Sequence, residues 1–211
     1  MRFPQARLLV FARKPALGKV KTRIAVGIGE VAALALYRKL LRDTLRRLCT
    51  ARLAPLECWC LPDCGHPDFD VWRTSAGMAC KRQRGGDLGE RMLFAAESAL
   101  REASFVVLLG TDCPRLDADY LNDALERLSA GAEMVIGPAL DGGYVLLGMR
   151  RADRRLFSDM PWGSDQVYAI TMRRALALGY IVEELEALAD IDEPGDLVSL
   201  PGWDSPSPTD C

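Results

Sequence analysis

Short apolar runs that alternate with helical stretches are the feature that most constrains the fold of this chain. The runs are Leu8–Ala12, Leu56–Leu61, Phe105–Leu109, Met134–Ile136, Tyr144–Met149 and Tyr180–Val182. Apolar runs of this length are typical of strands buried on both faces of a parallel sheet. The alternation therefore predicts an α/β protein, a three-layer αβα arrangement with a mostly parallel central sheet.

The segments between the runs have the period, the caps or the terminators of helices. From Gly29 to Cys49 apolar residues recur with a helical period and arginines occupy the other face. Further helices are predicted over Asp87–Leu100 and Asp117–Leu128, each with an aspartate as N-cap, over Ser164–Leu178, which Gly179 ends, and over Pro194–Leu200. We expect Pro62–Gly77, which is rich in turn formers, to be irregular.

The length and composition indicate one globular unit. A chain of 211 residues fits a single domain, which we place at residues 1–200, and the Ser/Pro-rich residues 201–211 are expected to be a disordered tail. No apolar stretch is long enough to span a membrane, and a net charge of −2 gives no general attraction for nucleic acid. Seven cysteines and no export signal predict a cytoplasmic protein with free thiols.

A basic loop follows the first predicted strand, over Arg13–Arg23. Gly18 would let backbone N–H groups approach phosphate oxygens, and Lys14, Lys21 and Arg23 would neutralise them. The alternative is a solvated basic loop without a ligand. The loop is not a P-loop, because Gly18-Lys19 is followed by valine where a serine or threonine is required.

Acidic residues follow two of the predicted strands. Asp112 comes directly after Phe105–Leu109, where a carboxylate suits Mg²⁺ or Mn²⁺ shared with substrate phosphates. A helix cap is its alternative role, but Asp117 is better placed for that. The motif Asp190-Ile191-Asp192 follows the last strand, and one of its two carboxylates would supply a second ligand for the same ion while the other acts as an N-cap-like group.

The segment Asp141-Gly142-Gly143 has two interpretations. Paired glycines after an aspartate commonly form a hairpin turn. They would equally let a ligand approach the backbone, with Asp141 offering its carboxylate to an acceptor hydroxyl as a base. Both interpretations stay open here.

Two further motifs carry weaker signals. The segment Gly86–Arg91 either places a backbone turn and Arg91 near a nucleotide, with Asp87 as a nucleotide-binding residue, or simply starts a helix with Asp87 as its cap. Cys58, Cys60, Cys64 and His66 fit no common zinc spacing, so whether they bind zinc is left open.

Six ordered blocks resemble a family of small bacterial GT-A-like proteins assigned as glycosyltransferases or nucleotide-diphospho-sugar transferases, some of them linked to arsenosugar biosynthesis. The blocks are Phe11–Arg23, Gln83 with Gly86–Met92, Gly110–Pro114, Gly137–Pro138 with Asp141–Tyr144, Trp162–Asp165 and Asp190–Pro194. The resemblance covers nearly the whole chain to about Leu200.

The resemblance implies a GT-A fold of the nucleotide-diphospho-sugar transferase type. It implies that Lys21, Thr22 and Arg23 lie on the nucleotide phosphates and that Asp112 and Asp192 bind the metal. A glycosyltransferase of this type usually has a D-x-D motif after the central strand. Here that position reads Thr111-Asp112-Cys113, with one carboxylate, so the donor type stays open.

Three functions are compatible with these residues. The first is metal-dependent glycosyl transfer from a nucleoside-diphosphate sugar to a small-molecule acceptor, with Asp141 and Asp112 in the catalytic centre. The second is nucleotidyl transfer from an NTP to a phosphorylated small molecule, in which pyrophosphate leaves. The third is a non-catalytic nucleotide-binding domain, a nucleotide-sensing or scaffolding domain that keeps the fold without turnover. The nucleotide base, the sugar, the acceptor, the stereochemical course and the oligomeric state are not predicted.

Overall fold

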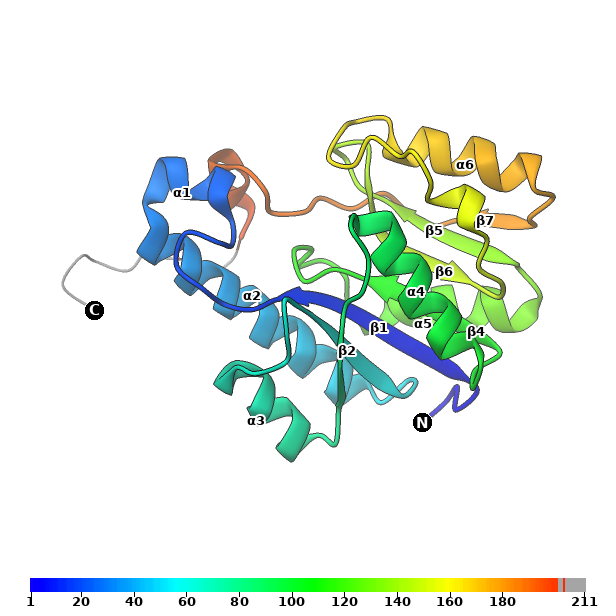
Figure 1. Ribbon diagram of the computed structural model, residues 1–211, viewed down its shortest axis with the longest axis horizontal. Coiled ribbons are helices and arrows are strands. Elements are labelled where there is room, and N and C mark those ends of the chain that lie inside the picture. Colours follow the sequence, from blue (N-terminus) through cyan, green and yellow to red (C-terminus); the bar gives the residue numbers. More distant parts are fainter. Residues whose placement is uncertain (201–202, 204–211) are drawn as a thin grey trace.

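The structure is a computed structural model that describes residues 1–200 and residue 203. The predicted tail, residues 201–211, lies outside the described residues except for Trp203. In chain order the elements are β1 (Ala6–Arg13), α1 (Thr22–Ile28), α2 (Glu30–Ala51), β2 (Leu56–Leu61), α3 (Pro67–Ser75), β3 (Ala79–Arg82), α4 (Leu88–Leu100), β4 (Phe105–Leu109), α5 (Ala118–Ala130), β5 (Met134–Pro138), β6 (Tyr144–Met149), the 3₁₀ turn η1 (Arg154–Leu156), α6 (Val167–Ala177), β7 (Val182–Glu184) and η2 (Pro194–Ser199) (Figure 1).

One seven-stranded sheet, in the order β3-β2-β1-β4-β6-β5-β7, forms the centre of the molecule. Neighbouring strands are parallel except for β6, which runs antiparallel to both β4 and β5. The sheet confirms the predicted mostly parallel α/β fold. Because β6 starts where β5 ends, the turn between them lies at the edge where the parallel strands have their carboxyl ends.

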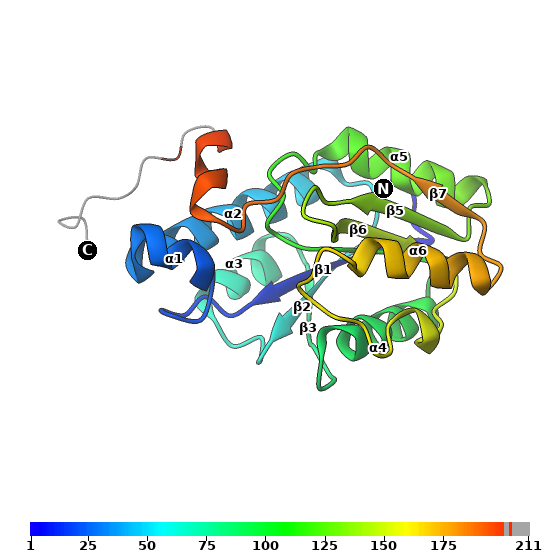
Figure 2. The same cartoon turned by 90° about the horizontal axis from the view of Figure 1, so that it is seen from above.

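Helices cover both faces of the sheet, which gives three layers (Figure 2). Residues of β1 alternate between the faces, as the pleat requires: Leu8 and Val10 pack with buried residues of α2 and α5, and Leu9 packs with α4 and α6. The run Leu8–Ala12 therefore meets helices on both sides, which accounts for its lack of polar residues.

A smaller apolar cluster joins the two ends of the chain. Ile24 of α1 and Leu36 of α2 are fully buried together with Ile191, which precedes η2, and Trp203 packs against the same group. As a result, α1 and η2 lie together beyond the carboxyl edge of the sheet (Figure 1).

Several predicted helix ends are confirmed. Asp87 caps α4 by accepting from the backbone N–H of Glu90, and Asp117 caps α5 by accepting from that of Tyr120. None of the helices in the described part of the chain is both long and apolar enough to cross a membrane.

Other predictions are wrong in detail. Residues 62–77 are not wholly irregular, because α3 begins at Pro67 with His66 as its N-cap. The last strand is shifted to Val182–Glu184, and α6 begins at Val167, three residues later than predicted. The edge strand β3 and the short helix α1 were not predicted: β3 contains two basic residues in four, and α1 has one buried side chain, so neither has a clear apolar period.

Candidate functional site

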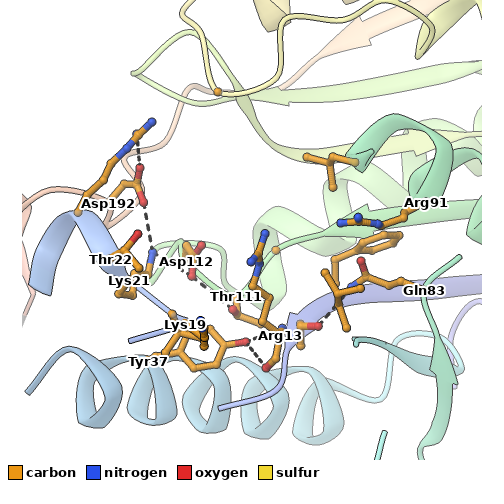
Figure 3. Close-up of a pocket in the computed structure, with 18 of the residues that line it drawn as sticks. Arg13, Lys19, Lys21, Thr22, Tyr37, Gln83, Arg91, Thr111, Asp112 and Asp192 are labelled. Atoms are coloured by element: carbon orange, nitrogen blue, oxygen red, sulfur yellow. Dashed lines mark hydrogen bonds and ion pairs between the residues drawn. The ribbon is translucent and has the colours of Figure 1, made fainter. Parts of the chain in front are cut away.

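A cleft of about 570 Å³ opens at the carboxyl ends of β1, β2 and β4 (Figure 3). Its charged lining consists of five basic side chains, Arg13, Lys19, Lys21, Arg23 and Arg91, and three carboxylates, Asp112, Asp141 and Asp192. Basic groups outnumber acidic groups by two, so the cleft is suited to an anionic ligand.

The basic loop contributes only part of its predicted residues to the cleft. Lys21, Thr22 and Arg23 line it, but Lys14 and Gly18 are not part of the lining. Lys14 forms an ion pair with Asp63, 3.3 Å away, and Gly18 has φ +67° in a turn against Glu30, so both are engaged elsewhere.

Lys21 has the most constrained conformation in this loop. Its backbone is left-handed, with φ 48° and ψ 44°, at the residue that precedes α1. Such a conformation costs a non-glycine residue about 1–2 kcal/mol and persists only where the surroundings enforce it. The side chain is 4% exposed, and its ammonium donates to the carbonyl oxygen of Ile191.

Asp112 and Asp192 both face the Lys21 ammonium. Nζ is 3.1 Å from Oδ1 of Asp112 and 3.8 Å from Oδ1 of Asp192. Arg23 pairs with the other oxygen of Asp192 at 2.6 Å. Residues 80 positions apart in the sequence thus share one cation, which places the two predicted metal ligands together.

The backbone after β7 is fixed in a way that brings Asp192 to this position. The N–H of Ile191 donates to the carbonyl oxygen of Asp112 at 2.9 Å. The carboxylate of Asp196 accepts from the N–H groups of Asp192 at 2.9 Å and Glu193 at 2.7 Å. Asp192 is therefore anchored on both sides in the chain.

Asp141 combines the two roles that its sequence context suggests. Its Oδ1 accepts from the N–H of Gly143 at 2.8 Å, so it stabilises the turn, and its side chain also lines the cleft. Gly142 has φ +89°, and a Cβ there would lie 2.2 Å from the carbonyl oxygen of Asp165. Only glycine fits this turn, which the segment before α6 covers.

Asp190 belongs to the same acidic group but was not among the predicted site residues. Its pKa is raised to about 6, first by burial and then by the charges of Asp141 and Asp192, against the opposing charge of Lys21. The only sequence signal for it was its place in the Asp190-Ile191-Asp192 motif.

The predicted nucleotide-binding residue Asp87 does not line the cleft and acts as the cap of α4. Arg91, one turn later, does line it, and its guanidinium donates to the carbonyl oxygens of Gly85 at 3.1 Å and Gly86 at 3.0 Å. Gln83 also lines the cleft, with its amide held by Ala12.

Tyr37 supports the end of β1 beneath the cleft. Its hydroxyl donates to the carbonyl oxygen of Arg13 and accepts from the N–H of the same residue, both at 2.7 Å. Burial raises the pKa of Tyr37, so it stays protonated as the donor. This role was not predictable from the sequence, because Tyr37 falls in the apolar stripe of α2.

The oxygen atoms of Asp112 and Asp192 are the candidate ligands for a divalent ion. Among residues 1–200 and 203, no group of three or more histidine, cysteine, aspartate or glutamate side chains is placed to hold a metal. Mg²⁺ and Mn²⁺ are commonly held by one or two carboxylates together with substrate phosphates, and Asp112 and Asp192 supply two hard oxygen donors. The pair fits an ion shared with a phosphorylated ligand.

The cysteine group lies away from the cleft lining. Cys58 and Cys60 are buried free thiols on β2, with Sγ atoms 3.6 Å apart. His66 is occupied as a helix cap, since its Nδ1 accepts from the N–H of Asp68 at 3.2 Å.

Two comparisons with known proteins find relatives. A family model described as "uncharacterized protein conserved in bacteria (DUF2064)" matches residues 44–164. The structure of a candidate nucleotide-diphospho-sugar transferase from Desulfovibrio desulfuricans G20 is 33% identical, with a TM-score of 0.80, over 90% of this chain and 83% of that one. No curated protein matches the chain.

More distant structures share the fold. CMP:2-keto-3-deoxy-manno-octonic acid synthetase, complexed with CTP, has a TM-score of 0.58 and 12% identity over 92% of this chain and 96% of that one. Glucosyl-3-phosphoglycerate synthase from Mycobacterium tuberculosis, with Mn²⁺, UDP and glucosyl-3-phosphoglycerate, has a TM-score of 0.55 and 11% identity over 93% and 75%. These neighbours are transferases, and at such identities they establish the fold alone.

Proposed function

Because this chain belongs to the bacterial DUF2064 family, within the nucleotide-diphospho-sugar transferase superfamily, we propose that it transfers a glycosyl group from a nucleoside-diphosphate sugar to a small-molecule acceptor. The observation that carries this proposal is the composition of the cleft. Basic side chains suited to a diphosphate surround two adjacent carboxylates at the carboxyl edge of the sheet, where α/β proteins bind their ligands.

The basic groups would bind the diphosphate. Lys21, Thr22 and Arg23 come from one loop and the start of α1, and Arg13 and Lys19 lie in the same cleft. Arginine can bind a phosphate through two parallel hydrogen bonds, whereas lysine acts as a compact point charge. Five cations would stabilise the negative charge that develops on the leaving nucleoside diphosphate.

Asp112 and Asp192 would hold Mg²⁺ or Mn²⁺. When bound, such an ion withdraws charge from the phosphate oxygens. A glycosyltransferase neighbour in the fold comparison was solved with Mn²⁺ and UDP, which supports a metal of this class.

Asp141 is the candidate base. An acceptor hydroxyl attacks the anomeric carbon, the bond from that carbon to the diphosphate oxygen breaks, and its electron pair leaves with the diphosphate. The hydroxyl proton passes to a carboxylate. Asp141 lines the cleft and is oriented by the Gly143 N–H through Oδ1, so that Oδ2 can accept the proton.

Nucleotidyl transfer from an NTP is the second candidate. Five basic side chains also suit a triphosphate, and a neighbour in the fold comparison is a synthetase complexed with CTP. The same groups would then stabilise departing pyrophosphate.

Thermal denaturation with nucleotides separates the candidates. With Mn²⁺ and a UDP- or GDP-sugar at about 100 times Kd, binding adds about 2.7 kcal/mol, and the expected rise in Tm is about 5–10 °C. EDTA should abolish the rise. A metal-dependent rise with an NTP but not with nucleotide sugars would favour nucleotidyl transfer, and no rise with any nucleotide would contradict both enzymes and favour a scaffolding domain.

Asp112→Asn tests the metal assignment. The variant should lose the metal-dependent rise in Tm and any release of nucleoside diphosphate from the donor, because an amide does not supply the charge of a carboxylate. Asp119→Asn, at an exposed aspartate on α5, is the matched control. Unchanged turnover in Asp112→Asn would contradict the assignment.

A further inference from the structure

The ammonium of Lys21 occupies the space that a metal shared by Asp112 and Asp192 would need. Nζ lies 3.1 Å from a carboxylate oxygen of Asp112 and 3.8 Å from one of Asp192 (Figure 3). It also donates to the carbonyl oxygen of Ile191. The ammonium therefore has one hydrogen bond to a carbonyl oxygen and two carboxylates that compensate its charge.

This position is built into the fold. The Lys21 side chain is 4% exposed, whereas those of Asp112 and Asp192 are 44% and 39% exposed. The left-handed backbone at Lys21 is followed by α1, whose residue Ile24 is fully buried. Of these three side chains, Lys21 is therefore the buried one, and the two carboxylates contact its ammonium from the side of the cleft.

A divalent ion that enters alone meets an obstacle. It must take oxygens that already bind Lys21 and Arg23, and it leaves the nearly buried ammonium without partners of opposite charge. An uncompensated buried charge is strongly unfavourable. Without a phosphorylated ligand, the two carboxylates should therefore bind Mg²⁺ or Mn²⁺ weakly.

A diphosphate removes this obstacle. Its oxygens offer new acceptors to Lys21 and Arg23 at the same time as they offer ligands to the metal. Lysine has a flexible four-carbon stem, so the ammonium can move without a change of the helix.

We propose that Lys21 pairs with the carboxylates of Asp112 and Asp192 as long as no phosphorylated ligand is bound. When such a ligand binds, Lys21 releases the two carboxylates to a divalent ion. Metal and diphosphate then bind interdependently, and by linkage each raises the affinity for the other by the same factor. This inference rests on the proposed function, since it takes Asp112 and Asp192 as the metal ligands.

The first test measures the affinity for Mn²⁺ without any nucleotide. The readout is the electron paramagnetic resonance signal of free Mn²⁺. Lys21→Met should bind Mn²⁺ about tenfold more tightly than the wild type, and Asp112→Asn in the same variant should remove this gain. Lys19→Met is the control, because Lys19 contributes the same charge to the same cleft but has no ion pair with a described residue. Equal gains in Lys21→Met and Lys19→Met would overturn the proposal, since general electrostatics would then explain both.

A second measurement uses the wild-type protein and so does not depend on the folding of a variant. The ¹H–¹⁵N signal of the Lys21 ammonium, assigned by its absence in Lys21→Arg, should not move with Mg²⁺ alone and should move with Mg²⁺ and inorganic pyrophosphate. A full shift with Mg²⁺ alone would overturn the proposal. Neither test requires a nucleotide sugar, so failure of the donor panel to bind would contradict the proposed function and leave these results interpretable.

Discussion

At the scale of single residues, Asp190 is a carboxyl group whose pKa is strongly raised by its surroundings. Its pKa is raised to about 6, first by burial and then by the carboxylates of Asp141 and Asp192, against the opposing charge of Lys21. A carboxyl whose pKa is higher in the folded state stabilises the fold fully below the unfolded pKa, and that stabilisation is lost as the pH rises through the folded pKa. Ionised Asp190 therefore destabilises the metal-free protein above about pH 6.

Asp190→Asn should consequently stabilise the protein at about pH 8 by about 1–2 kcal/mol, less than the full shift implies because the site is partly hydrated. The gain should disappear below about pH 4, where both states of the wild type bind the proton. The measurement is urea denaturation against pH in the presence of EDTA. A difference between the two proteins that stays constant with pH would contradict the pKa assignment.

Part of the site follows from the sequence at this scale. Asp112 and Asp141 each lie three residues after a strand, at the edge where the parallel strands have their carboxyl ends, so their place at this edge was predictable. Asp192 lies eight residues after β7, and backbone hydrogen bonds that the sequence does not reveal bring it to the cleft. Which lysine enters the cleft was not predictable. The left-handed backbone at Lys21 directs that side chain inward, while Lys14 reaches Asp63, and composition does not encode such directions.

At the scale of elements, the packing of α1 against η2 positions Arg23. A Cβ on Gly27 of α1 would lie 2.9 Å from Cβ and Cγ of Pro194, so only glycine allows the two elements to pack so closely. Since Arg23 lies on α1 and pairs with Asp192 beside η2, this packing fixes one side of the cleft.

Gly27→Ala should lower Tm and weaken the ligand-dependent rise in Tm. Overpacking costs about 1–3 kcal/mol, which outweighs the gain of up to about 1 kcal/mol from the better helix propensity of alanine. Gly195→Ala is the matched control in the adjoining element, because a Cβ there meets nothing within 4 Å. Equal Tm values for the two variants would show that α1 and η2 are not tightly packed.

The elements with a strong apolar signal were predicted, and the weak ones were not. Phe105–Leu109 is buried throughout, so β4 was evident from the sequence. β3 is a four-residue edge strand with partly exposed side chains, and α3 buries only Phe69. Such segments take their structure from neighbours in space, which single-sequence periodicity does not report.

At the scale of the whole molecule, the cleft joins segments from both ends of the chain. Lys21 and Asp192 are 171 residues apart in sequence, yet they share a contact. Ligand binding should therefore reduce hydrogen exchange in residues 14–28 and in residues 185–200 together, because both segments contribute groups to one site.

Hydrogen exchange followed by mass spectrometry, with Mn²⁺ and a nucleotide that raises Tm, measures this effect. The helix α3 has no residue in the lining of the cleft and serves as the internal reference. Protection confined to residues 14–28 would contradict a site completed by Asp192.

The late position of Asp192 also has a consequence for biosynthesis. Translation proceeds from the amino terminus, and the strands β1 to β6 are complete by Met149, well before Asp192 is added. A nascent chain at that stage can assemble most of its sheet while the loop Arg13–Arg23 lacks the segment that pairs with Lys21 and Arg23. Until the segment through Asp196 has left the ribosome, one of the three carboxylates that line the cleft is missing and one wall of the cleft is incomplete.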